Sequence, residues 1–377
     1  MIIKKCSADS NELDEILINC SDQMKMYRNM IHLIRNIQFS YKVKTVVFYK
    51  IEDNKLTSLL CCYYIKNINT LCSIRDINQV NTDNNIVRFA AEYCREAGIK
   101  NIFIYSNEHE KNIVGDINNT KNISLKLFKS IIDQWKDLPK KTRNMVRKGE
   151  KNGLKISYDK SNINEFYCIY VLSMLKKNVV PHTYRFMENM LKTTNNVELI
   201  TTIFEGKVIA GLIVIRSGQY ATYPFHASNS DFVDKKPNHL LIWEMITHCI
   251  KYNVNKIDLG EASDGSGVYK FKKSFGGHIS DIYKISMDTA IMPDMINNDC
   301  CTDINSVSIS KNIVYRSTYI GYIQRVFFLI REKMKYFKVD FFKIIILIPC
   351  RIITLVSFFL FQFITENRVV FFCHNTR

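Results

Sequence analysis

The residues best suited to chemistry follow the segment Ile257-Asp258-Leu259, which predicts a short buried strand. Small and polar residues then form a predicted loop: Gly260, Glu261, Ser263, Gly265, Ser266 and Gly267. Glycine tolerates positive φ and has no Cβ, so a glycine loop lets backbone N–H groups come close to a ligand. Because open α/β sheets bind ligands at the carboxyl ends of their strands, this loop is a candidate binding site.

Aromatic and cationic side chains alternate directly after the loop, at Tyr269, Lys270, Phe271 and Lys272. Either lysine can donate to an anionic ligand or to the negative charge that develops on a reacting carbonyl. The alternation also fits one face of a strand, and core packing is the competing explanation for both aromatic residues, favoured for Phe271. A solvated surface turn whose lysines serve solubility is the alternative for the whole segment.

Several side chains near this segment are candidate proton acceptors. They are Asp258, Glu261, Asp264, His226, His239 and His278. His226 directly follows residues 220–225, which predict a strand. No Ser/His/Asp or Cys/His arrangement is recognisable, so covalent catalysis is not predicted. No Cys-x-x-Cys and no Cys/His cluster with zinc spacing occurs, so no metal site is predicted.

The elements that must position these residues occur twice along the chain. Residues 199–204 and 208–215 predict a hairpin, and a helix at 238–252 follows, with Leu241, Met245, Cys249 and Tyr252 at helical spacing. About one domain length earlier, the same order appears as a hairpin at 45–51 and 56–65, a helix at 85–98 and a strand at 101–105. The order predicts a duplicated α/β unit, although hairpin–helix–strand is also common in unrelated α/β proteins.

A basic helix is predicted near residues 137–155. Lys140, Arg143, Arg147 and Lys151 lie three or four residues apart, on one face. Such a face attracts phosphates with little sequence preference, and a solvated helix surface is the alternative. No nucleic-acid-reading signature occurs, so DNA is not a predicted partner.

These motifs together resemble the Fem-type acyltransferases, a branch of the GNAT superfamily. That branch includes peptidoglycan-bridge aminoacyltransferases and acetyltransferase-like relatives in cell-envelope polysaccharide gene sets. Four features carry the resemblance, which covers roughly residues 127–285: the Trp243-Glu244 pair, the Asp258-Leu259-Gly260 strand end, the segment 266–276 and the basic segment 140–153. It implies an α/β fold of two tandem GNAT-like domains, at 1–125 and 126–290, with mixed twisted sheets flanked by helices.

The resemblance implies transfer of an acyl or aminoacyl group to an amine of a peptidoglycan or surface-polysaccharide precursor, by direct attack in a ternary complex. Lys272, beside Phe271, matches the lysine of the family's Phe-Lys pair, and Tyr269 is expected to contact the donor. The donor is acyl-CoA or aminoacyl-tRNA, with no tightly bound cofactor. The pyrophosphate-binding glycine signature of many coenzyme-A-binding GNAT domains is absent, which fits the branch and leaves the donor open. A non-catalytic scaffold for anionic lipid or RNA, or for assembly alone, is the rival prediction.

The net charge indicates an anionic partner, which is nucleic acid, an acidic membrane face or a phosphorylated substrate, with simple solubility as the alternative, and the C-terminal segment favours a membrane. The formal charge is +16, and cations dominate a tail predicted at 311–377, after a linker at 291–310. Residues 344–363 are mostly apolar, but Arg351 and Pro349 interrupt them, so a membrane-associated tail is favoured over a spanning anchor or an internal packed helix. The first residues lack the apolar core of a secretory signal, so a cytoplasmic protein at the inner face of the membrane is expected.

Overall fold

The computed structural model describes residues 2–18, 25–53, 55–75, 84–106, 116–177, 179, 181–193 and 196–289. The predicted linker and tail, 291–377, lie outside these residues. Among the helices of the described ranges, none is both long and apolar enough to cross a membrane.

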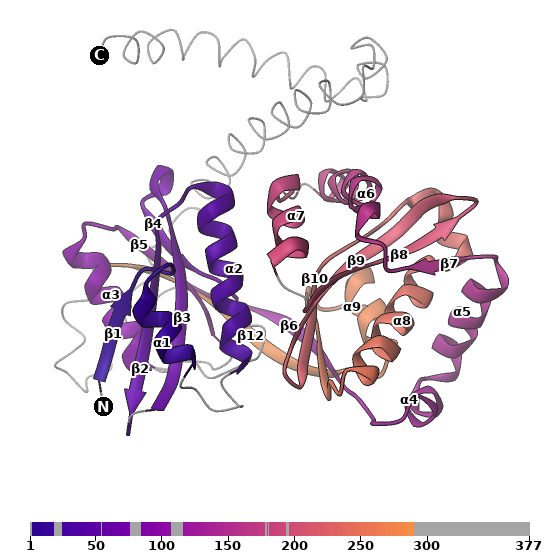
Figure 1. Ribbon diagram of the computed structural model, residues 1–377, viewed down its shortest axis with the longest axis horizontal. Helices are drawn as coiled ribbons and strands as arrows, with labels where there is room; N and C mark the ends of the chain where they lie inside the picture. The colour runs from indigo at the N-terminus through magenta and orange to yellow at the C-terminus, as the bar shows by residue number, and fades with distance from the viewer. Residues whose placement is uncertain are drawn as a thin grey trace, which may run out of the picture. The chain divides into compact units, whose positions relative to one another are not determined.

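The first half of the fold consists of five strands and the helices between them (Figure 1). In chain order these are β1 (Ile2–Cys6), α1 (Asn11–Ile18), α2 (Lys25–Tyr41), β2 (Thr45–Glu52), β3 (Lys55–Ile65), β4 (Thr70–Ser73), α3 (Asn84–Glu96) and β5 (Asn101–Ser106). The predicted hairpin, helix and strand are therefore confirmed. Gly98, two residues beyond α3, has φ +68°, which fits its predicted place at the end of this helix.

The second half repeats this plan. Its elements are β7 (Lys155–Ser157), α6 (Ile163–Lys176), α7 (Tyr184–Thr193), β8 (Val197–Phe204), β9 (Lys207–Ser217), β10 (Tyr220–Ser228), α8 (Pro237–Lys251) and β11 (Lys256–Ala262). Helices α4 (Ile131–Asp137) and α5 (Lys140–Lys151) precede this half, and α9 (Gly267–Lys273) follows it. The basic helix is therefore shorter than predicted, because Gly153 has φ +75° and ends it before β7.

The pairing pattern of the strands shows that the two halves share one topology. The sheet has the order β1-β2-β3-β4-β5-β12-β6-β11-β10-β9-β8-β7. The strand order of the second half is therefore the reverse of the strand order of the first. Neighbours are antiparallel except β4 with β5 and β10 with β11, which are parallel in both halves. Equivalent helices, α3 and α8, connect these parallel strands. This correspondence confirms the prediction of two tandem GNAT-like units with mixed sheets.

The two halves exchange their last strands. Strand β6 (Asp116–Lys126) follows β5 in the chain but pairs with β11, and β12 (His278–Asp288) follows β11 but pairs with β5. The two exchanged strands pair with each other at the middle of the sheet. In Figure 1 the orange β12 runs from the second half into the first. Each half therefore depends on a strand from the other. Strand β6 was not predicted from the sequence.

Helix α8 forms the centre of the core in the second half. Leu241, Met245 and Cys249 are fully buried, as their helical spacing predicts, whereas Tyr252 is 50% exposed because α8 has ended before it. Helix α5 packs closely on α8 at Gly149, where an added Cβ would lie 3.1 Å from the Leu240 Cβ. This packing fixes α5 and α8 beside the strands that carry the site.

Candidate active site

The site begins where β10 and β11 separate. Their parallel pairing covers only three residue pairs and ends at Thr222 and Asp258. Beyond that point β10 pairs with β9 past a bulge between Thr222 and Phe225, and β11 pairs with β6 past an irregularity between Asp258 and Gly260. Strands that part in this way leave backbone groups available to a ligand at the carboxyl end of the parallel pair.

Two glycines of the predicted loop have the positive φ that favours glycine. Gly260 has φ +82° and Gly265 has φ +69°, whereas Gly267 has no positive φ. The backbone N–H of Gly260 donates to Asp258 Oδ1 at 2.8 Å. Ser263, Gly265 and Gly267 are exposed. Non-glycine residues adopt such φ values only at a cost, so Gly260 and Gly265 are needed for the path of the chain.

The stretch after the loop is a helix, so the competing interpretation that placed Tyr269 and Phe271 on one face of a strand is wrong about the secondary structure. Residues Gly267–Lys273 form α9, whose N-cap Ser266 accepts a hydrogen bond from the Tyr269 N–H at 3.1 Å. The alternation of side chains at 269–272 imitated a period of two, but the Ser266 cap favours a helical turn. Phe271 packs against the second-half core, as favoured from sequence, and Tyr269 also contacts that core.

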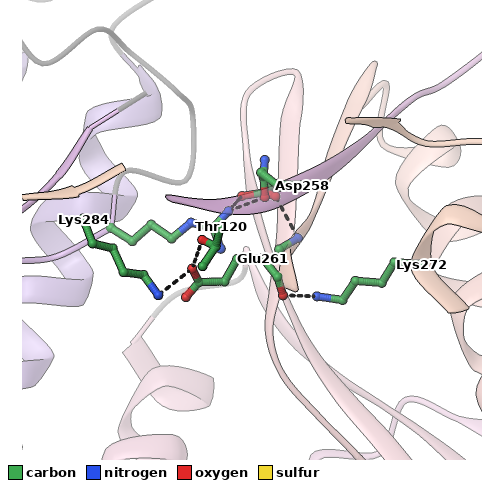
Figure 2. Close-up of polar contacts among 8 residues, drawn as sticks. Thr120, Asp258, Glu261, Lys272 and Lys284 are labelled. Atoms are coloured by element: carbon green, nitrogen blue, oxygen red, sulfur yellow. Dashed lines mark hydrogen bonds and ion pairs between the residues drawn. The ribbon is translucent and has the colours of Figure 1, made fainter. Parts of the chain in front are cut away.

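Lys272 is the lysine that α9 directs towards Gly260. Its Nζ donates to the backbone carbonyl of Glu261 at 3.1 Å, and it lies 3.2 Å from the point that a Cβ at position 260 would occupy. Burial, together with the nearby positive charge of Arg75, lowers the pKa of Lys272 to about 8. Lys270, in contrast, is exposed on α9. Figure 2 shows the Lys272 ammonium extended towards the Glu261 carbonyl.

Asp258 is buried and fully engaged by its neighbours. Its Oδ2 pairs with Arg75 Nη2 at 2.9 Å, while Oδ1 accepts from Gly260. Arg75 follows β4 in the first half, and the same Nη2 also donates to Asn122 Oδ1 at 2.5 Å. Asp258 therefore fixes the strand end and a cation from the other half. A carboxylate tied in this way is poorly suited to accept a proton from substrate.

Glu261 is held between the two exchanged strands. It accepts a hydrogen bond from the Thr120 hydroxyl of β6 at 2.7 Å and forms an ion pair with Lys284 of β12 at 2.9 Å (Figure 2). Burial raises the pKa of this carboxyl, but the contacts with Lys284 and Thr120 outweigh burial and lower it. The Glu261 carboxylate is therefore ionised and paired near neutral pH. The backbone carbonyl of the same residue accepts the hydrogen bond that orients Lys272.

His226 is a neutral imidazole in a defined orientation. Its Nε2 lies 3.0 Å from Asn238 Oδ1, and the Asn238 amide nitrogen donates to Ser228 Oγ at 3.0 Å. This assignment makes Nε2 the donor and leaves the lone pair on Nδ1. Burial lowers the pKa of His226 to about 4, so the ring is uncharged near pH 7.

The other candidate acceptors are less well placed. Burial also lowers the pKa of His239 to about 4, and its ring lies 5.1 Å from Phe271 and 5.9 Å from Phe275. Asp264 and His278 are exposed. His239 is thus a packing residue, and His226 is the histidine that keeps a hydrogen-bonded orientation beside α9.

The basic face of α5 contributes to the fold as well as to charge. Arg143 Nη1 donates to the carbonyls of Lys136 at 2.6 Å and Trp135 at 3.3 Å, and so caps the end of α4. The guanidinium of Arg147 lies 5.2 Å from the centre of the Trp135 ring, and Arg147 itself is exposed. The Thr142 hydroxyl donates to the carbonyl of Ser274, which ties α5 to the end of α9.

Sequence reasoning missed the residues that enter this site from the first half and the exchanged strands. They are Arg75, Thr120, Asn122 and Lys284. Arg75 lies 183 residues from Asp258, and no local pattern connects the two. The one available signal was position, because Arg75 follows β4, the strand equivalent to β10.

Comparisons with known proteins agree with this geometry. Residues 137–273, which contain β10, β11 and α9, match the family model of the acetyltransferase (GNAT) domain. This match covers less than half of the chain, so it assigns the likeness to the GNAT domain to this segment. A lipid II:glycine glycyltransferase of Staphylococcus epidermidis is 26% identical over 107 residues, covering 25% of this chain and 26% of that protein. The chain therefore matches about a quarter of the length of that relative.

One solved structure has a similar fold. The crystal structure of FemX has a TM-score of 0.52 with this chain at 11% identity, covering 76% of this chain and 97% of the FemX chain. At that identity the likeness concerns the fold. Together with the GNAT domain and the glycyltransferase match, it confirms the resemblance to the Fem-type branch predicted from sequence.

Proposed function

We propose that the protein is a Fem-type acyltransferase that transfers an acyl or aminoacyl group to an amine of a cell-envelope precursor. The observation that carries the proposal is Lys272, a partly buried ammonium beside Gly260 where β10 and β11 separate, inside the matched GNAT domain. The name of the glycyltransferase relative, which specifies lipid II and glycine, supports a peptidoglycan precursor as the acceptor.

The proposed reaction is direct attack in a ternary complex. The acceptor nitrogen forms a bond to the donor carbonyl carbon, negative charge develops on the carbonyl oxygen, and the thiolate or ribose oxygen of the donor then leaves. Lys272 donates to that developing oxyanion, since only one of its N–H groups is directed to the Glu261 carbonyl. The attacking nitrogen loses one proton, for which the Nδ1 lone pair of His226 is the proposed acceptor.

Tyr269 and the loop are proposed to position the donor. Tyr269 lies three residues before Lys272 on α9, so the two side chains share one side of the helix. The donor is an acyl-CoA thioester or an aminoacyl-tRNA, both of which carry phosphates that the exposed Arg147 face of α5 can attract. The tail at 311–377 is proposed to hold the enzyme at the cytoplasmic face of an anionic membrane.

The test is transfer by the full-length protein from labelled acetyl-CoA and from labelled glycyl-tRNA to a lipid II acceptor. We expect product from one donor class, and a loss of about 100-fold or more in turnover for Lys272→Gln, the magnitude typical of a lost oxyanion donor. Lys270→Gln is the matched control, because this lysine is exposed on the same helix. Equal rates for wild type and Lys272→Gln would refute the assignment.

Absence of transfer from both donors, with binding retained, would instead support a non-catalytic scaffold. Unfolding curves of both variants complete the test, since loss of the folded state would also abolish transfer. We expect the two variants to unfold at the same denaturant concentration within error, because Lys270 is exposed and the hydrogen bond of Lys272 is to a backbone carbonyl and not to a carboxylate.

A further inference from the structure

Two cations, one from each half of the fold, converge on Gly260. Arg75 Nη1 and Lys272 Nζ lie 3.5 Å and 3.2 Å from the point that a Cβ at position 260 would occupy. We propose that Arg75 and Lys272 together bind one oxyanionic group of a substrate, a carboxylate or a phosphate, over Gly260. This site rests on the proposed function, because it places that anion beside the lysine that polarises the reacting carbonyl.

The orientation of Arg75 is fixed by two acceptors on one side of its guanidinium. Both Asp258 Oδ2 and Asn122 Oδ1 accept from Nη2, at 2.9 Å and 2.5 Å, whereas Nη1 lies towards Gly260. The Arg75 side chain is 22% exposed, so its guanidinium is held by neighbours yet reaches the surface. A planar guanidinium held along one side presents its other nitrogen to a ligand in a defined direction.

The junction contains more hydrogen-bond donors than acceptors. Within the described part of the chain, Arg75 Nε and Asn122 Nδ2 are buried and have no hydrogen-bond partner. Buried polar groups are normally satisfied, and each exception requires an explanation. A ligand that carries only acceptor atoms suits such a place, and oxyanions are ligands of that kind.

The local charges also favour an anion. Asp258 neutralises Arg75, and Glu261 is neutralised by Lys284, which leaves the charge of Lys272 without a carboxylate of its own. Burial and the charge of Arg75 lower the pKa of Lys272, as expected for a cation that has too little negative charge nearby. A bound oxyanion would supply the missing negative charge and raise that pKa.

Glycine at position 260 is what gives an oxyanion room. A side chain there would begin within van der Waals distance of both cationic nitrogens, and the positive φ of Gly260 already excludes most residues. Because both nitrogens lie so close to one point, a single carboxylate or phosphate can bridge them. The first half of the fold is then part of the binding site and does more than support it.

Binding of two probes to the full-length protein tests this site without any transfer reaction. Inorganic pyrophosphate represents a phosphate source and malonate a carboxylate source, each titrated by calorimetry against wild type, Lys272→Gln and the double variant Arg75→Gln/Asp258→Asn. The double variant removes both charges of the buried pair together, so that no unpaired Asp258 remains. Lys207→Gln is the control, because this lysine is exposed at the start of β9 and lies outside the proposed site.

We expect one probe to bind, with affinity lowered at least 10-fold in both the Lys272 variant and the double variant and unchanged in the control. Combining the three substitutions should weaken binding by less than the product of the separate effects, because one anion uses both cations. Wild-type affinity in the double variant would overturn the role of Arg75. Failure of both probes to bind at millimolar concentration would overturn the site.

The proposed function can fail separately. If probe binding depends on both cations but no donor supports transfer, the two-cation site stands and the acyltransferase assignment falls. If transfer occurs and depends on Lys272 while the double variant binds probes as wild type does, the enzyme assignment stands and Arg75 serves only the fold.

Discussion

Arg75 and Asp258 lie 183 residues apart in the chain and form an ion pair of 2.9 Å between the two halves of the fold. Asp258 is 4% exposed and ends the parallel pairing of β10 with β11. The pair therefore connects the end of β4, in the first half, to the strand end that carries Gly260. A contact of this kind makes the geometry of the site depend on correct packing of both halves.

Breaking that pair on one side should destabilise the protein. For Asp258→Asn we expect a loss of about 1.5–3 kcal/mol in the free energy of unfolding, the range for hydrogen bonds to charged groups, measured by urea denaturation. Adding Arg75→Gln to this variant should cost less than Arg75→Gln costs in the wild type, because the cation then has no carboxylate to lose. Strictly additive losses would show that the two side chains are not coupled.

The alkaline limb of the pH dependence of kcat/KM, which reports the free enzyme, should report Lys272. If its ammonium donates to the oxyanion, kcat/KM falls as the pH rises through the lowered pKa of about 8. Arg75 lowers this pKa, so Arg75→Gln should move the alkaline limb to higher pH, whereas Lys272→Gln should abolish it. An alkaline limb that stays in place in both variants would assign it to another group.

Gly260 and Gly265 offer a matched pair of substitutions. Both have positive φ, so Gly260→Ala and Gly265→Ala should each lose about 1 kcal/mol of stability from backbone strain. Only at Gly260 does the new Cβ approach Lys272 and Arg75, since nothing lies within 4 Å of a Cβ at Gly265. Turnover per folded molecule should therefore fall for Gly260→Ala and stay near wild type for Gly265→Ala. The reverse order would place the chemistry elsewhere in the loop.

Gly211 of β9 tests the packing of the second half. A Cβ there would lie 2.5 Å from Phe166 Cδ2 on α6, which no relaxed structure permits. We expect Gly211→Ala to reduce the free energy of unfolding by about 1–3 kcal/mol through overpacking, read from thermal or urea denaturation. Gly267→Ala is the control, because a Cβ at that position meets nothing within 4 Å. Similar stability of the two variants would mean that Phe166 moves aside at little cost.

Sequence patterns predicted the elements whose residues face one core. The apolar spacing in α8 and the paired β-rich runs of both hairpins were sufficient, because burial there follows the period of a single helix or strand. The alternation at 269–272 was misleading, since α9 is only seven residues long and is defined by its Ser266 cap. Short elements depend on caps and neighbours more than on period.

Strand β6 and the partners of the site could not be predicted in the same way. The segment 116–126 is rich in asparagine and has few apolar residues, and it is a strand because β11 and β12 pair with it on both sides. Arg75, Asn122 and Lys284 approach the site through such long-range pairing. Lys272 and Gly260 were identified because both lie within one continuous segment.

The exchange of β6 and β12 sets an order on the synthesis of this protein. A nascent chain that has reached β5 exposes the free edge of that strand, and the partner for this edge, β12, is encoded some 180 residues later. Until the ribosome has delivered residue 288, the amino-terminal sheet has an open border of unsatisfied backbone groups. The topology therefore gives the nascent chain an edge that is open to wrong pairing until β12 is made.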